Sequence, residues 1–134
     1  MQANTERTTI LVIDDMSVML KMLAKHLEYW GYRALTAASG EEGLQLAKTE
    51  QPDLILLDIV LPKMKGREVC ARLKAEPTTK HIPVIFLSAL GLADHVKAGL
   101  DLGAEDYVIK PFKPEDLQER IRVCLLRYHR QPAA

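Results

Sequence analysis

Polar side chains stand at the ends of four short apolar runs, and their types suit phosphate chemistry. Carboxylates, a hydroxyl and an ammonium group, together with a metal ion, can position a phosphoryl group and neutralise its charge during transfer. No histidine, Ser–His pair or Cys–His pair follows these runs, so acyl-transfer chemistry is not supported. The residues that end the runs are Asp14 with Asp15, then Asp58, Ser88 and Lys110.

The three aspartates predict a cation site if they lie close together. Neighbouring carboxylates repel, so such a cluster either holds a carboxyl with a raised pKa or binds a cation. Oxygen ligands with room for water suit Mg²⁺, which proteins commonly bind through one or two carboxylates and phosphate oxygens. The chain has no glycine-rich phosphate loop, which argues against a nucleotide substrate.

The apolar runs that carry these residues are expected to be buried strands of a parallel sheet. They are short and lack polar alternation, as strands covered on both faces do. The central run, residues 54–58, is flanked by Pro52 and Pro62. Ligands of open parallel sheets bind just beyond the carboxyl ends of the strands. Five strands are predicted, over residues 9–13, 32–37, 54–58, 83–88 and 106–110, with the second at the sheet edge.

Helical patterns follow each predicted strand. Gly31 is placed to end the first helix, Ser39 and Glu42 form a capping box before the second, and Pro114 opens the last. Alternating strands and helices predict an α/β fold with helices on both faces of the sheet. Right-handed crossovers and a switch in winding direction would then bring the ends of the first and third strands together. The first four helices are predicted over residues 17–30, 40–50, 66–75 and 93–102.

Composition is ordinary for one globular domain. The 134 residues are 48% hydrophobic and 27% charged, and 18 Lys+Arg balance 18 Asp+Glu, which argues against wholesale nucleic-acid binding. Cys70 and Cys124 lack a Cys-x-x-Cys pattern and are expected to be reduced core residues. Neither a signal pattern nor an apolar run of membrane-spanning length is seen, so a cytoplasmic location is expected. The expected division is a tail over residues 1–8, a domain over 9–130 and a stub over 131–134.

Four motifs give the chain a family resemblance. Over residues 9–127 it resembles the receiver domain of bacterial two-component response regulators, including the chemotaxis-type regulators. The resemblance implies a flavodoxin-like, doubly wound, five-stranded parallel sheet in the order 2-1-3-4-5, with five helices. The matching motifs are Ile13-Asp14-Asp15, Leu57-Asp58 followed by Leu61-Pro62, Leu87-Ser88-Ala89, and the run 102–112 that contains Tyr107 and Lys110-Pro111-Phe112.

The resemblance also implies a role for each site residue. Asp58 would be the phosphoacceptor, and Lys110 and Ser88 would contact phosphoryl oxygens. Mg²⁺ would be bound directly by Asp15, Asp58 and the backbone carbonyl of Val60, and through water by Asp14. Tyr107 would be the switch aromatic that turns inward when Ser88 moves, and the Lys110–Pro111 peptide bond would be cis.

Partners follow from the same resemblance. The phosphoryl donor would be a sensor histidine kinase or a phosphotransfer protein, and catalysis would be limited to the domain's own phosphorylation and dephosphorylation. Helix 93–102, strand 106–110 and the last helix would present the surface that changes on activation, where Gly99 should lower the cost of moving the helix. That surface would contact a downstream protein, an output domain or a second copy of the chain, with no direct contact to nucleic acid or membrane.

Two apolar residues depart from the commoner family pattern. Val60 lies two residues after the phosphoacceptor, and Leu90 lies two residues after Ser88. Polar groups often occupy these positions in the family, and some of them orient a hydrolytic water. The sequence therefore predicts a long-lived acyl phosphate.

Two other functions remain open on the sequence alone. A Mg²⁺-dependent phosphatase or phosphotransferase would also use an aspartate at a strand end, but usually with a second aspartate where this chain has Val60. A flavin mononucleotide carrier of the same topology would need a hydroxyl-rich loop where this chain has Asp14-Asp15-Met16. A stand-alone receiver and a receiver cut from a longer chain would look alike.

Overall fold

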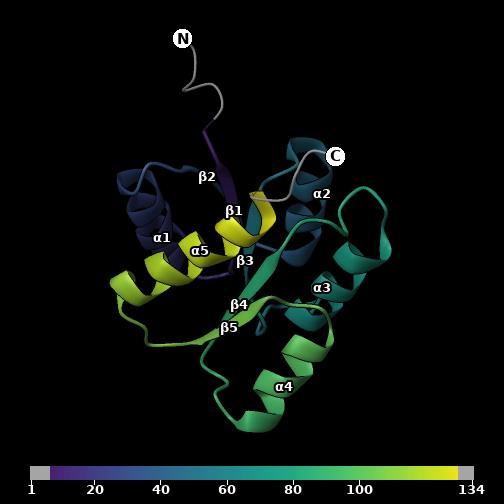
Figure 1. Cartoon of the computed structure of the whole chain (residues 1–134). Coiled ribbons are helices and arrows are strands. Elements are labelled where there is room, and N and C mark those ends of the chain that lie inside the picture. The colour runs from purple at the N-terminus through teal and green to yellow at the C-terminus, as the bar shows by residue number, and fades with distance from the viewer. Residues whose placement is uncertain (1–6, 130–134) are drawn as a thin grey trace.

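The structure, a computed structural model, describes residues 7–129 and is built on a parallel sheet in the order β2-β1-β3-β4-β5 (Figure 1). The predicted fold class and the strand order are both confirmed, with β2 at one edge and β5 at the other. Every strand lies within one residue of its predicted bounds. The strands are β1 (Thr9–Ile13), β2 (Arg33–Ala37), β3 (Leu54–Asp58), β4 (Val84–Ser88) and β5 (Asp106–Ile109).

Five helices cover the two faces of this sheet. Helices α1 and α5 lie on one face, and α2, α3 and α4 lie on the other (Figure 1). The two that were predicted one residue too long are α1, which ends before the C-cap Trp30, and α4, which ends before Leu102. The helices are α1 (Ser17–Tyr29), α2 (Gly40–Glu50), α3 (Gly66–Ala75), α4 (Ala93–Asp101) and α5 (Pro114–His129).

The helix ends follow the predicted local chemistry. Gly31 has a φ of +97°, the left-handed conformation that favours glycine after a helix. The Ser39 hydroxyl accepts a hydrogen bond from the Glu42 backbone N–H at 3.1 Å. The Glu42 carboxylate reaches back one residue further than expected, to the N–H of Ala38 at 2.8 Å. The capping box before α2 is therefore present, with its reciprocal bond displaced by one residue.

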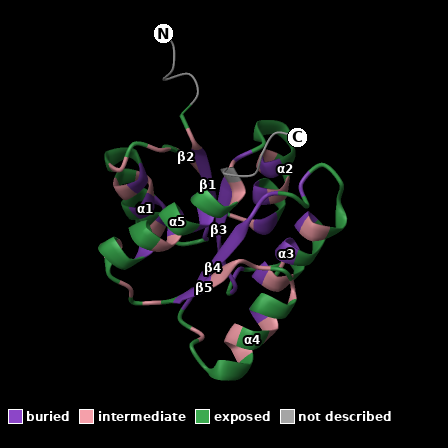
Figure 2. Cartoon of the chain, viewed as in Figure 1, coloured by how far each residue is buried: buried purple, intermediate pink, exposed green. Residues whose placement is uncertain are grey.

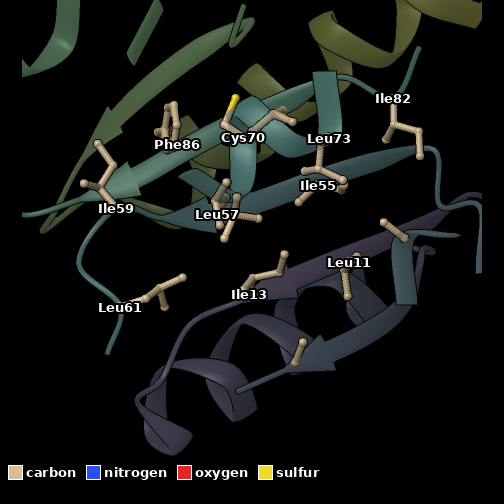
Figure 3. Close-up of a cluster of buried hydrophobic side chains, with 14 of the residues drawn as sticks. Leu11, Ile13, Ile55, Leu57, Ile59, Leu61, Cys70, Leu73, Ile82 and Phe86 are labelled. Atoms are coloured by element: carbon tan, nitrogen blue, oxygen red, sulfur yellow. The ribbon is translucent and has the colours of Figure 1, made fainter. Parts of the chain in front are cut away.

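Side chains of the central strands are buried on both faces of the sheet, which explains why their sequences do not alternate (Figure 2). On the face of α2 and α3, odd-numbered residues of β1 and β3 pack against the helices, with Cys70 and Leu73 from α3 (Figure 3). On the opposite face, the even-numbered residues pack against α1 and α5. The four odd-numbered strand residues are Leu11, Ile13, Ile55 and Leu57.

Three further features bear on the sequence-based expectations. Within residues 7–129, no helix combines the length and apolar character that a membrane crossing requires. The predicted C-terminal stub, 131–134, and most of the predicted tail, 1–8, lie outside the described residues, so that division stays a prediction. The Lys110–Pro111 peptide bond is cis, as the family resemblance implied.

Candidate functional site

The pairing register brings the polar strand ends to one edge of the sheet. Ile13 of β1 pairs with Leu57 of β3, so the residues that follow them, Asp14 and Asp58, emerge side by side. On the other side of β3, Asp58 pairs with Leu87 of β4, which precedes Ser88. The backbone N–H of Lys110 donates to the carbonyl of Ser88 at 2.8 Å and continues the β4–β5 pairing. Adjacent parallel strands thus deliver acids, a hydroxyl and a lysine to the same rim.

The three aspartates form a compact acidic cluster. Each offers a carboxylate oxygen, and these atoms lie within 4.8 Å of one another. Asp14 and Asp58 are buried, whereas Asp15 is exposed to solvent. Backbone N–H groups fix the two buried carboxylates: that of Met16 donates to Asp14 at 2.9 Å, and that of Val60 donates to Asp58 at 3.1 Å. The predicted juxtaposition of Asp14, Asp15 and Asp58 is present.

Lys110 joins the cluster from the other side. Its Nζ lies 3.0 Å from Asp14 Oδ2 and 3.2 Å from Asp58 Oδ2, so one ammonium group bridges two buried carboxylates. Burial acts to lower the pKa of Lys110, but its hydrogen bonds and the charges of both aspartates outweigh burial and raise that pKa. The ammonium form is therefore favoured at this rim.

The pKa of Asp58 is raised above that of an ordinary aspartate. Burial raises its pKa, and the nearby charge of Asp14 raises it further. The hydrogen bond from Val60 and the charge and hydrogen bond of Lys110 lower the pKa, but together they do not cancel the effect of burial, which is the largest contribution. A divalent cation beside these carboxylates would offset the free-energy cost of burying their negative charges and the repulsion between them. The donor set of oxygens, partly open to water through Asp15, fits a hard cation such as Mg²⁺.

Ser88 and Tyr107 are linked to each other through the backbone of Leu90. The Ser88 hydroxyl accepts a hydrogen bond from the Leu90 N–H at 3.2 Å, and the Tyr107 hydroxyl donates to the Leu90 carbonyl. The Tyr107 side chain is turned inward and is 6% exposed. Its ring packs against Phe86, with ring centroids 5.9 Å apart. The sequence predicted roles for Ser88 and Tyr107 but not the link that Leu90 makes between them. That link uses the backbone N–H and carbonyl of Leu90, which any residue type could provide.

Gly66 packs against the backbone of Asp58 and Ile59. Its N–H donates to the Ile59 carbonyl at 2.9 Å, which holds the start of α3 against the loop after β3. A Cβ added at Gly66 would lie 2.2 Å from the Asp58 carbonyl oxygen and 2.6 Å from the Ile59 Cα. The sequence suggested only that α3 begins here. This glycine therefore fixes the position of Asp58 as well as opening a helix.

A hydrogen bond between α3 and α4 was also not predicted from the sequence. The Arg67 guanidinium, one residue after Gly66, lies 3.0 Å from Nδ1 of His95 in the first turn of α4. Arginine can only donate, so Nδ1 of His95 is the acceptor in this contact. The start of α3, beside Asp58, is thereby connected to the start of α4.

Comparison with known proteins assigns the family. Residues 10–122 match the family model described as the response regulator receiver domain. The chain belongs to the receiver domain family of response regulators. Receiver domains accept phosphoryl groups in two-component signalling and are signalling modules rather than metabolic enzymes.

Solved receiver domains share the whole fold. The chain resembles a CheY-like receiver domain protein from Methanospirillum hungatei JF-1, with a TM-score of 0.87 and 30% identity, over 93% of this chain and 98% of that one. It also resembles the chemotaxis protein CheY4 of Vibrio cholerae, with a TM-score of 0.83 and 28% identity, over 87% of this chain and 98% of that one.

Two relatives are full transcriptional regulators. The DNA-binding dual master transcriptional regulator RpaA of Synechocystis sp. is 43% identical over 93% of this chain and 52% of its own length. The alkaline phosphatase synthesis transcriptional regulatory protein PhoP of Bacillus subtilis is 42% identical over 88% of this chain and 48% of its own length. The chain thus spans about half the length of these relatives.

Proposed function

We propose that Asp58 accepts a phosphoryl group from the phosphohistidine of a sensor histidine kinase or a phosphotransfer protein, with residues 9–130 acting as the receiver unit. The observation that supports this most is the placement of the Asp58 carboxylate. It lies at the rim of the sheet, 3.2 Å from the Lys110 ammonium, with two further aspartates close enough to share a cation. An aspartate carboxylate, a fixed cation and an acidic metal site are the parts that phosphoryl transfer needs.

The metal site would be formed by the acidic cluster. Asp15, Asp58 and the backbone carbonyl of Val60 would bind Mg²⁺ directly. Asp14 would act through water, as the family resemblance implies; its carboxylate accepts hydrogen bonds from Lys110 and from the Met16 N–H. When bound, Mg²⁺ supplies positive charge beside the oxygens of the transferred group.

Asp58, Lys110 and Ser88 would each have a separate role in the transfer. An oxygen of Asp58 forms a bond to phosphorus as the P–N bond of the phosphohistidine breaks, and the imidazole leaves with the electron pair of that bond. Lys110 holds a phosphoryl oxygen by charge and hydrogen bonding, which replaces part of its present contact with Asp58. Ser88 donates its hydroxyl to another phosphoryl oxygen, and a turn of its side chain toward that oxygen would weaken the hydrogen bond that it now accepts from the Leu90 N–H.

Loss of the hydrogen bond between Ser88 and the Leu90 N–H would connect the reaction at Asp58 to the protein surface. The Tyr107 hydroxyl bonds the carbonyl of Leu90, so movement of this segment and the position of the tyrosine ring depend on each other. The output face would be α4, β5 and α5, where large apolar side chains are exposed, among them Leu92, Leu100 and Ile109. A downstream protein, an output domain or a second copy of the chain would bind there.

Location and contacts complete the proposal. The domain would act in the cytoplasm, with no contact of its own to nucleic acid or membrane. Any DNA contact would belong to a separate output domain of the kind that the longer regulators carry. The chain's own catalysis would extend only to its phosphorylation and dephosphorylation.

Mg²⁺ binding should stabilise the fold measurably. At a hundred times its dissociation constant, Mg²⁺ is expected to raise the free energy of unfolding by about 2.7 kcal/mol, because the cation binds the folded chain and not the unfolded one. Denaturant unfolding with and without MgCl₂ measures this difference. Asp15→Asn is the matched variant, since Asp15 is exposed and its removal leaves the buried contacts in place. An equal response of wild type and Asp15→Asn to MgCl₂ would contradict the site.

The side chain of Val60 should govern the lifetime of the acyl phosphate. It is 56% exposed beside Asp58 and offers no group to orient an attacking water. Val60→Asn is expected to shorten the half-life of the phosphorylated chain by about tenfold, within the range that positioning of a reactant supplies. The decay of the phosphoprotein in Mg²⁺, followed by intact mass, tests this. A wild-type half-life of seconds, or equal decay of the two chains, would refute the role assigned to Val60.

A further inference from the structure

Gly99 lies where α4 meets two aromatic rings. It is buried in the last turn of the helix, against Phe86 of β4 and Tyr107 of β5. A Cβ added there would lie 3.0 Å from Cδ2 of Phe86 and 3.1 Å from Cδ2 of Tyr107, both shorter than ordinary van der Waals contact. Glycine is less favourable than alanine inside a helix, so Gly99 does not increase the stability of α4 itself. The absence of a side chain matters because it lets α4 approach both rings.

The two rings differ in their freedom to move. Phe86 belongs to a strand flanked on both sides by other strands, and its side chain is fully buried in the cluster under α3 (Figure 3). Tyr107 belongs to the edge strand β5, and Ile109, on the same face of that strand, is 45% exposed. A methyl group at position 99 would therefore displace Tyr107 before it displaces Phe86.

Displacement of the Tyr107 ring would break a specific contact. The ring is held inward between Gly99 and Phe86, and from there its hydroxyl reaches the Leu90 carbonyl. A ring that leaves this position cannot keep that hydrogen bond. The Leu90 N–H is bonded to Ser88, so the effect would extend to the segment beside the phosphoacceptor site.

We propose that Gly99 is a positioning residue for the switch: its missing side chain leaves room for Tyr107 in the inward position, and a methyl group there would crowd that position and shift the ring toward the outward one. The sequence suggested instead that Gly99 makes α4 easier to move. The two roles differ, because a mobile helix would tolerate a methyl group, whereas a closely packed one would not. The inference rests on the proposed function only in linking Tyr107 to events at Asp58.

The direct test is ¹⁹F NMR of the chain labelled with 3-fluorotyrosine, with the Tyr107 resonance assigned by its loss in Tyr107→Phe. In Gly99→Ala the Tyr107 resonance should move toward that of free fluorotyrosine and gain the H₂O/D₂O isotope shift of an exposed ring. The resonances of Tyr29, Tyr32 and Tyr128 should stay in place. Lys97→Ala, an exposed change in the same helix, should leave all four unchanged. A Tyr107 resonance that stays in place and protected in folded Gly99→Ala would overturn the proposal.

A second measurement guards against a variant that fails to fold. Gly99→Ala should lower the melting temperature more in the wild-type chain than in a Tyr107→Leu background, where the added methyl group still meets Phe86 but no tyrosine ring, and alanine keeps its helix advantage. If Gly99→Ala alone does not fold, the double variant should fold; an equal loss in both backgrounds would overturn the proposal. Neither measurement needs a phosphoryl group. A chain that is phosphorylated on Asp58 but shows no response of Tyr107 to Gly99→Ala would therefore refute this inference and leave the proposed function intact.

Discussion

Replacing Gly66 with alanine should lower the free energy of unfolding by about 3 kcal/mol, at the upper end of the usual cost of overpacking. The added Cβ would lie 2.2 Å from the Asp58 carbonyl oxygen, 2.6 Å from the Ile59 Cα and 2.9 Å from the Asp58 carbonyl carbon. All three are backbone atoms of β3 and the loop after it, so no side-chain rotation relieves the clash. Either α3 or the Asp58 segment must shift. Urea unfolding of the two chains measures the effect.

Gly91→Ala is the matched control. The nearest atom to a Cβ at that position is Cγ2 of Ile109, at 3.0 Å, on a side chain that is half exposed and free to turn. This variant should change the free energy of unfolding by less than about 1 kcal/mol, as substitutions away from the core do. If Gly66→Ala unfolds at the same urea concentration as Gly91→Ala, the close approach of α3 to Asp58 does not exist in solution.

Replacing Lys110 with methionine should slow phosphorylation of the chain by acetyl phosphate about 100-fold. That is the size of effect seen when one fixed donor is removed from a developing negative charge. Methionine keeps much of the length of lysine and removes the ammonium that lies 3.0 Å from Asp14 and 3.2 Å from Asp58. The same change should tighten Mg²⁺ binding, because the cation no longer shares the carboxylates with a fixed positive charge. Rates come from intact mass, and affinities from calorimetric titration.

Lys113→Met provides the comparison for Lys110→Met. Lys113 lies three residues further along the chain and is exposed, before the first turn of α5. Its removal changes the net charge by the same amount without touching the acidic cluster, so phosphorylation should proceed at nearly the wild-type rate. A Lys110→Met chain that is phosphorylated as fast as Lys113→Met would remove Lys110 from the mechanism.

The sheet could be predicted from the sequence because each strand carries its own signature. The runs that became β1, β3 and β4 are short, apolar and bounded by turn-forming residues, and their full burial matches that pattern. The errors fall at the ends, where Trp30 and Leu102 cap helices instead of continuing them. The strand order came from the family resemblance, since local patterns do not say which strands become neighbours.

The acidic cluster could also be foreseen, because it needs only strand ends and topology. Asp14 and Asp15 directly follow β1 and Asp58 ends β3, so the sheet alone brings them together. What escaped prediction depends on distances between elements. Gly66 and Gly99 look like ordinary helix glycines in the sequence, and their contacts with neighbouring backbone and rings appear only once α3 and α4 are packed.

The central claim is that Asp58 is the single acceptor of a phosphoryl group, and intact mass after incubation with acetyl phosphate and Mg²⁺ tests it most directly. The wild-type chain should gain one phosphoryl group. Asp58→Ala should gain none, and Asp15→Ala should gain only a small fraction, because it lacks a proposed metal ligand. A wild-type chain that stays unmodified, or an Asp58→Ala chain that gains the same mass as the wild type, would contradict the account.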